Sequence, residues 1–158
     1  MKYLSKSVEE TYKIAEDFLE KIKEIKSNQA VMVGLFGDLG SGKTTFTQAI
    51  GKILGVKETI TSPTFVIMKK YEVSSIQYPV LNTQYPILNT KYSTLIHIDA
   101  YRLDSGQELD SLDFATDLAN PNNLILLEWP ERVADILPAD LIKINFKFIS
   151  ENEREIEI

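Results

Sequence analysis

The fold is decided by the stretch VMVGLFGDLGSGKTT, residues 31–45. Its second half matches the pattern G-x-x-x-x-G-K-[ST] at every required position, with Gly37, Gly42, Lys43 and Thr44. A phosphate chain needs many converging donors, and a bent glycine loop turns backbone N–H groups inward without a Cβ to crowd the phosphates. The lysine then reaches the β- and γ-phosphates, and the threonine hydroxyl ligates Mg²⁺. The stretch therefore predicts a nucleotide-binding P-loop.

The sequence on both sides of this loop fits a strand–loop–helix unit. Ala30 to Phe36 is a short apolar run, as expected of a buried parallel strand. After the loop, Gly55 supplies a helix stop signal. The apolar residues that recur at helical spacing before it are Phe46, Ile50, Ile53 and Leu54. The N-terminus of this predicted helix adds a positive dipole where the phosphates would lie.

Composition limits the class of protein. The chain has 158 residues, 44% hydrophobic and 25% charged, which fits one soluble globular domain over residues 1–158. It has no cysteine and one histidine, so disulfide frameworks and thiolate or histidine metal clusters are excluded. The formal net charge of -6 argues against gripping nucleic acid directly, so a partner would hold any RNA. No run is long enough to span a bilayer and no leader pattern opens the chain, so we expect a cytoplasmic protein.

The segment before the P-loop predicts an amphipathic helix that packs on the sheet. Ser7 and Glu10 form a capping-box pattern at its start. One face is apolar, with Ile14, Phe18, Leu19, Ile22 and Ile25. Thr11 lies in the first turn; it is kept as a candidate nucleotide contact, although a surface threonine is the favoured account.

Residues 60–65 read ITSPTF and predict a rigid loop that enters a strand from Phe65 to Tyr71. Three hydroxyl side chains surround Pro63, namely Thr61, Ser62 and Thr64. Two interpretations stay open. In one, the hydroxyls satisfy local backbone groups in a turn. In the other, the loop is a switch that senses the γ-phosphate or Mg²⁺.

Residues 73–93 carry a tandem repeat, QYPVLNT followed by QYPILNT, over residues 77–90. Two seven-residue copies are too few for a solenoid, and Pro79 and Pro86 exclude a central strand or a continuous helix. We interpret the repeat as a loop insertion in a connection between two strands, in preference to a contact arm anchored by its tyrosines.

Two further apolar runs each end in an acid, Thr94 to Asp99 and Leu124 to Glu128. Each resembles a strand that delivers a carboxylate to the edge of the sheet where ligands bind in open α/β folds. One acid would hold Mg²⁺ and the other would orient the attacking water, and which acid does which stays open. His97 shares a strand face with Asp99, where a satisfied core histidine is the favoured account.

The remaining chain predicts short helices and a closing hairpin. Ser105 to Glu108 is a capping-box candidate for a helical segment through Leu112, and Asp113 to Asn120 continues helically. The alternating residues Ile142, Ile144, Phe146 and Phe148 and the segment 154–158 predict an antiparallel pair joined at Glu151-Asn152. The fold class expected is an α/β, P-loop NTPase-like three-layer sandwich with a mixed, mainly parallel sheet and a C-terminal antiparallel hairpin.

Four motifs occur in a fixed order along the chain. They are GDLGSGKTTFT at residues 37–47, TSPTF at 61–65, HIDAYRL at 97–103 and LEWPE at 127–131. Together they resemble the TsaE (YjeE) family, the P-loop ATPase of bacterial threonylcarbamoyladenosine synthesis on tRNA, over about residues 5–145. The repeat departs from the family by lengthening a hairpin that is short there.

The resemblance implies slow, Mg²⁺-dependent ATP hydrolysis and assembly with TsaD and TsaB, which transfer the threonylcarbamoyl group. The protein itself would not be the transferase; its ATP cycle would reset the complex, tRNA would be met only through that complex, and self-association is left open. Lys43, Asp99 and Glu128 would be catalytic, the last two with Thr44 at the metal, and residues 61–64 would form the first switch. The nucleotide would be held by Gly37, Asp38, Leu39, Gly40, Ser41, Gly42, Lys43, Thr44, Thr45 and Trp129.

A small-molecule P-loop kinase is the alternative from another class. Such enzymes usually carry an arginine-bearing lid, whereas the only arginines here are Arg102, Arg132 and Arg154, with no basic lid segment apparent. A GTP-binding switch is disfavoured too, because the chain lacks an Asn-Lys-x-Asp sequence.

Overall fold

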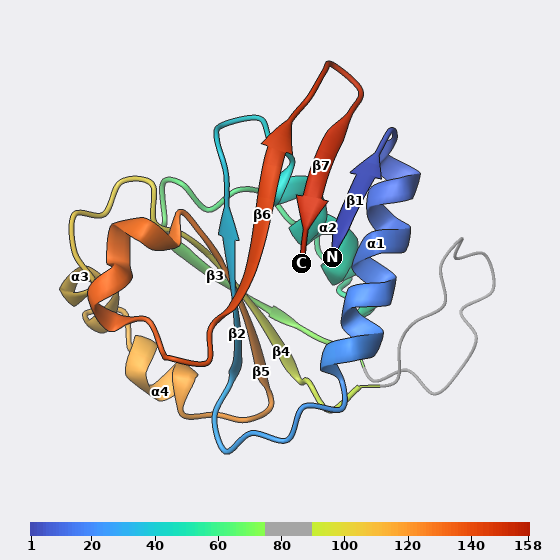
Figure 1. Ribbon diagram of the computed structural model, residues 1–158. Helices are drawn as coiled ribbons and strands as arrows, with labels where there is room; N and C mark the ends of the chain where they lie inside the picture. Colours follow the sequence, from blue (N-terminus) through green and yellow to red (C-terminus); the bar gives the residue numbers. More distant parts are fainter. Residues whose placement is uncertain (75–89) are drawn as a thin grey trace.

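The computed structural model describes residues 1–74 and 90–158, which form one seven-stranded sheet with helices on both faces (Figure 1). The strands are β1 (Lys2–Ser5), β2 (Val31–Phe36), β3 (Met68–Glu72), β4 (Thr94–Asp99), β5 (Asn123–Glu128), β6 (Ile142–Phe148) and β7 (Arg154–Glu157). The helices are α1 (Val8–Ile22), α2 (Lys43–Ile53), α3 (Gln107–Asp110), α4 (Phe114–Leu118) and the 3₁₀ segment η1 (Pro130–Ile136). The α/β fold class predicted from the sequence is confirmed.

The strand order is β1-β7-β6-β2-β5-β4-β3. The four central strands β6, β2, β5 and β4 run parallel, while β3, β7 and β1 join antiparallel at the two sides. This is the predicted mixed sheet, and β6 with β7 is the predicted C-terminal hairpin. Because β2, β4 and β5 are parallel, their carboxyl ends lie at one edge of the sheet, where open α/β folds bind ligands.

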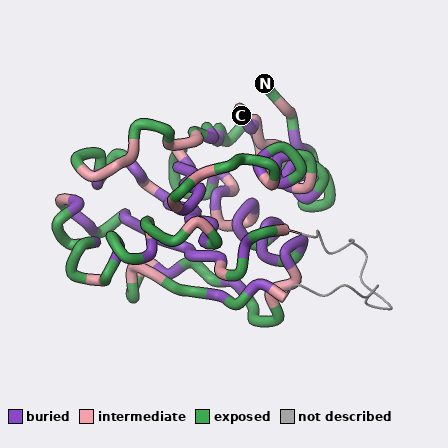
Figure 2. Tube along the Cα trace, turned by 90° about the horizontal axis from the view of Figure 1, so that it is seen from below, coloured by how far each residue is buried: buried purple, intermediate pink, exposed green. Residues whose placement is uncertain are grey.

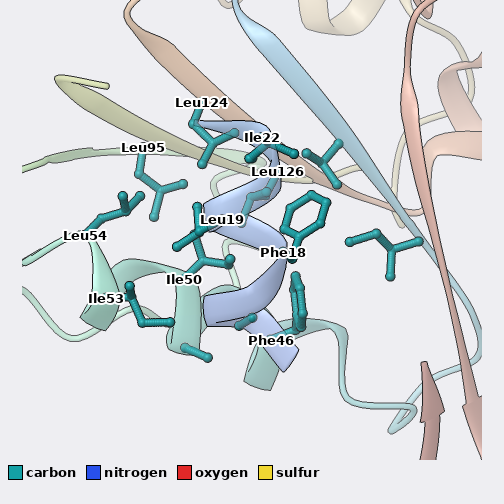
Figure 3. Packing of buried hydrophobic residues seen from close by; sticks show 14 of the residues in the cluster. Phe18, Leu19, Ile22, Phe46, Ile50, Ile53, Leu54, Leu95, Leu124 and Leu126 are labelled. Carbon is teal, nitrogen blue, oxygen red and sulfur yellow. The ribbon is translucent and has the colours of Figure 1, made fainter. Parts of the chain in front are cut away.

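Two apolar layers cover the sheet, and they confirm the three-layer arrangement. Side chains alternate along the strands, so Leu95 and Leu126 face α1 and α2, whereas Ile96 and Ile125 face α3, α4 and η1. Figure 3 shows the first layer, in which residues of α1 and α2 meet leucines of β4 and β5. Figure 2 shows the buried residues concentrated in the interior of the trace. The site is therefore carried by a rigid, fully packed sheet.

The α1 helix begins as predicted but ends earlier. Ser7 accepts a hydrogen bond from the Glu10 N–H at 3.2 Å, while the Glu10 carboxylate reaches the N–H of Lys6, at 2.7 Å. Ile25 was expected on the buried face; this was wrong, because α1 ends at Ile22 and Ile25 is 36% exposed. The strand β1, before this helix, was not predicted, since four residues are too short to show a period.

The strand predicted from Phe65 begins three residues later. Pro63 accepts backbone hydrogen bonds from Val66 at 3.0 Å and Ile67 at 2.6 Å, which turns the chain before β3 starts at Met68. Ile67 has φ +66°, a left-handed conformation that is costly for a β-branched residue. Phe65 is consequently 85% exposed. The turn closed onto the Pro63 carbonyl, with Ile67 in a left-handed conformation, therefore overrides the strand propensity of residues 65–67.

The second capping box is only half formed. The carboxylate of Glu108 accepts the Asp104 N–H at 2.8 Å, but the N-cap residue of α3 is Gly106 and no side chain caps it. This helix ends at Asp110 rather than Leu112, and α4 follows within the segment predicted to be helical. No helix within residues 1–74 and 90–158 has the length and apolar character needed to cross a bilayer.

The predicted insertion of residues 73–93 lies between β3 and β4 in the chain. β3 and β4 are antiparallel neighbours, and Val73 donates to the Ser93 carbonyl at 3.0 Å. The tandem repeat, apart from Thr90, lies outside the described residues.

Gly37→Ala is expected to destabilise the protein. The residue has φ +140°, and a Cβ there would lie 2.3 Å from the Phe146 carbonyl oxygen, part of the β6 backbone that holds the start of the loop. We expect a loss of about 3 kcal/mol in the free energy of unfolding, measured by denaturant titration.

Gly40→Ala is the matched control, because φ is +75° there but nothing lies within 4 Å of the added Cβ. Its expected cost is about 1 kcal/mol. Equal losses in the two variants would contradict the close packing of the loop against β6.

Candidate functional site

The carboxyl ends of β2, β4 and β5 open into one cavity of about 760 Å³. The glycine-rich loop (residues 37–42) and the start of α2 line one side, and Asp99 and Glu128, which pair in register across β4 and β5, line another. Further lining comes from the end of β1, the start of α1 and the β6–β7 hairpin, with Ser5, Lys6, Ser7, Val8, Thr11, Glu151, Asn152 and Arg154. The fold thus gathers elements from both ends of the chain around the loop.

Most of the residues predicted for the site meet at this cavity. The lining includes Leu39, Gly40, Gly42, Lys43, Thr44, Thr45, Ser62, Thr64, Asp99, Glu128 and Trp129, together with Thr11. Five predicted residues belong to the same loops but do not line it, namely Gly37, Asp38, Ser41, Thr61 and Pro63. Thr11 was favoured as a surface threonine; this was wrong, because it is buried and its hydroxyl lies 2.8 Å from that of Ser5.

The side chain of Lys43 is buried and folds back onto the loop. Its ammonium donates to the carbonyl oxygens of Gly37 at 2.6 Å and Asp38 at 2.9 Å, and lies 4.2 Å from the centre of the Trp129 ring. Burial lowers the pKa of this ammonium below its ordinary value, against the opposing effect of the nearby carboxylates, Glu128 first. A phosphate would supply the negative charge that these neutral carbonyls lack.

Glu128 joins the start of α2 to the sheet. Its Oε1 accepts a hydrogen bond from the Thr44 hydroxyl at 2.9 Å and lies 2.9 Å from His97 Nε2. His97 and Glu128 are both buried. The sequence placed His97 in the core but gave no sign of this partner, because the contact depends on the register of two strands.

Asp99 is surrounded by the loop that precedes β3. Its Oδ2 accepts from the hydroxyls of Ser62 at 2.9 Å and Thr64 at 2.6 Å, and its backbone N–H donates to the Ile67 carbonyl at 2.9 Å. Neither interpretation of these hydroxyls anticipated this: they bind the strand-end acid rather than local backbone. The loop is therefore fastened to a carboxylate that was predicted to lie at the metal.

Trp129 follows Glu128 directly in a left-handed conformation, with φ +59°. Its ring lies 5.1 Å from that of Tyr101 and over the Lys43 ammonium. A non-glycine residue at positive φ in a site is a sign of backbone held under strain by its surroundings.

Arg154 was not predicted as part of the site. Its Nε donates to the Gly40 carbonyl at 3.1 Å, and Nη1 donates to the carbonyls of Ser150 at 2.6 Å and Glu153 at 2.9 Å. This arginine ties the hairpin tip to the glycine-rich loop. Strand alternation could place Arg154 on a face of β7, but nothing in the sequence indicates that this face meets the loop.

The donor set fits a nucleotide with Mg²⁺. Within residues 1–74 and 90–158, no three His, Cys, Asp or Glu side chains gather into a metal cluster. Mg²⁺ in nucleotide sites is usually held by one or two carboxylates together with phosphate oxygens and water. Thr44, Asp99 and Glu128, which face one cavity beside a lysine, match that kind of site.

The comparison with protein families decides the relationship. The model described as "Threonylcarbamoyl adenosine biosynthesis protein TsaE" matches residues 5–156. The chain belongs to the TsaE family. The family predicted from the four sequence motifs is thus confirmed, and the match extends to the C-terminal hairpin.

TsaE relatives match the chain over most of its length. The Rickettsia felis protein named tRNA threonylcarbamoyladenosine biosynthesis protein TsaE is 35% identical over 147 residues, 92% of this chain and 72% of that protein. The Bacillus subtilis protein of the same name is 30% identical over 156 residues, 99% of this chain and 83% of that protein. The crystal structure of Bacillus subtilis YdiB has a TM-score of 0.66 and 28% identity, covering 99% of this chain and 82% of that one.

Removing the two hydroxyls that bind Asp99 is expected to loosen the loop of residues 62–67. In the double variant Ser62→Ala/Thr64→Val, we expect faster hydrogen exchange at the Ile67 amide, because that amide closes the turn onto Pro63. Thr61→Ala is the control, since Thr61 is exposed and outside the cavity. Unchanged exchange in the double variant would show that Asp99 does not hold the loop.

Proposed function

We propose that this chain binds and hydrolyses ATP with Mg²⁺ in the carboxyl-edge cavity, as the ATPase component of tRNA threonylcarbamoyladenosine biosynthesis. The observation that carries the proposal is the convergence of Lys43 and Thr44 with Asp99 and Glu128 on one cavity. Membership of the TsaE family supplies the biological setting.

The glycine-rich loop would hold the phosphates. Lys43 would exchange its two carbonyl acceptors for phosphate oxygens, and the N-terminus of α2 would face the same charge. The nucleoside would occupy the part of the cavity between the segment after β1 and the hairpin tip.

Thr44 would ligate Mg²⁺ together with one of the two acids, and the other acid would orient the attacking water. When bound, the metal would neutralise charge on the phosphate oxygens. Thr44 already donates to Glu128, so its hydroxyl lies beside one of the two acids that would hold the metal. Ser62 and Thr64 would report the state of Asp99 to the switch loop.

The positions of the three arginines favour acceleration of ATP hydrolysis by a partner protein. Arg102 lies 4.5 Å from the Phe65 ring, Arg132 lies 5.9 Å from the Tyr101 ring, and Arg154 is bound to backbone carbonyls. Arg102 and Arg132 do not line the cavity, and the guanidinium of Arg154, which does line it, is occupied by backbone carbonyls. We therefore propose slow hydrolysis by the isolated chain and acceleration by TsaD and TsaB. Contact with tRNA would occur through that complex, and a cytoplasmic location stays a prediction.

Lys43→Ala is expected to abolish ATP binding and turnover, because it removes the ammonium that would bind the β- and γ-phosphates. Isothermal titration with ATP and Mg²⁺ and a phosphate-release assay measure the two effects. Lys57→Ala, an exposed lysine beyond α2, is the control and should behave as the unsubstituted chain. Undiminished turnover in Lys43→Ala would contradict the proposed site.

The role in tRNA modification is tested by capture of TsaD and TsaB with the tagged chain, with and without ATP. Nucleotide-dependent capture, and faster phosphate release in the complex, are expected. Phosphorylation of a metabolite by the isolated chain would instead support the alternative, a small-molecule kinase. No observation on the described residues favours that alternative.

A further inference from the structure

His97 occupies the middle of β4, two residues before Asp99, and its side chain is fully buried. It pairs in register with Leu126 of β5, so Glu128 lies two residues further along the neighbouring strand, on the same face of the sheet. The Nε2 atom lies 2.9 Å from Oε1 of Glu128. The imidazole is thus a direct partner of an acid at the cavity, supplied by the sheet rather than by a loop.

The hydrogen bonds around the ring indicate which nitrogen carries the proton. Nδ1 of His97 is buried and has no hydrogen-bond partner in the described part of the chain. A hydrogen on Nδ1 would be an unpaired buried donor, whereas a hydrogen on Nε2 has the Glu128 carboxylate as acceptor. The arrangement favours a hydrogen on Nε2 that donates to Oε1 of Glu128.

Oε1 of Glu128 has two hydrogen-bond partners from different parts of the fold. The Thr44 hydroxyl belongs to the start of α2, at the phosphate loop, and the His97 ring belongs to the sheet. Under the proposed function, the Thr44 hydroxyl would be a ligand of the metal, and His97 of β4 would then be the remaining donor to Oε1 of Glu128. The other oxygen, Oε2, accepts no hydrogen bond from the described residues and stays available to the cavity.

We infer that His97 is a positioning residue for Glu128: its Nε2–H fixes Oε1 so that Oε2 is presented to the metal or to water. The inference rests on the proposed function. Outer partners of this kind orient the groups that contact a metal, and their loss typically costs about 10–100-fold in metal affinity or activity. A purely structural role would affect stability alone, since any buried carboxylate needs a donor.

The single histidine of the chain makes the hydrogen bond directly observable. Two-bond ¹H–¹⁵N spectra of the ligand-free protein contain one imidazole pattern and need no assignment among rings. The expected pattern is that of the hydrogen on Nε2, protected from exchange with water. The Nδ1–H pattern, or a rapidly exchanging average, would overturn the inference without reference to any nucleotide.

Two amide variants separate positioning from stability. In His97→Gln the amide nitrogen reaches the place of Nε2, while in His97→Asn it stops near the place of Nδ1 and falls short of Glu128. Both variants bury a polar amide, so both should lower the unfolding temperature. We expect the gain in ATP-analogue affinity on adding Mg²⁺, and ATP turnover, to fall about 10–100-fold in His97→Asn and to be largely kept in His97→Gln.

Affinity for the nucleotide without Mg²⁺ should change little in either variant, because the phosphate loop does not touch His97. Leu95→Val is the matched control, a buried residue of the apolar cluster on the same strand face, and it should lower stability without changing the Mg²⁺ dependence. An equal gain in ATP-analogue affinity on adding Mg²⁺ in His97→Asn, His97→Gln and Leu95→Val would overturn this inference and leave the proposed function standing. Absence of Mg²⁺-dependent ATP binding by the unsubstituted chain would overturn the proposed function and, with it, the inference.

Discussion

The parallel pairing of β4, β5 and β2 is the constraint on which the rest of the structure depends. It places Asp99 opposite Glu128 and carries the end of β2 to the same edge, where the glycine-rich loop begins. A shift of one residue in the register of β4 against β5 would place Asp99 and Glu128 on opposite faces of the sheet. The apolar layers on both faces make such a shift costly, so the geometry of the site follows from the packing of the core.

Within the described residues, the side chains predicted for the phosphates and the metal are hydrogen-bonded to other groups of the protein. Lys43 binds carbonyls of its own loop, Thr44 binds Glu128, and the hydroxyls of Ser62 and Thr64 bind Asp99. Buried charges are tolerated only when they are paired, which explains why these groups hold one another. We propose that a nucleotide with its metal would replace these internal partners together, which would link occupancy of the cavity to the loop of residues 62–67.

Much of this arrangement is readable from the sequence, because it depends on local signals. Apolar runs that end in glycine or an acid predicted β2, β4 and β5, and alternation predicted the closing hairpin. The errors fall where tertiary contacts decide the outcome. The strand predicted from Phe65 loses to a turn centred on Pro63, and Thr11 is buried by Ser5 of the unpredicted strand β1. Contacts between segments that are distant in the chain, such as Arg154 with Gly40, have no local sequence pattern that would predict them.

The most direct test of the account is a crystal structure with a non-hydrolysable ATP analogue and Mg²⁺. The account predicts the phosphates within the glycine-rich loop, Lys43 released from its carbonyls, and the metal beside Thr44 with a carboxylate from Asp99 or Glu128. An analogue bound elsewhere, or both carboxylates turned away from the metal, would contradict it.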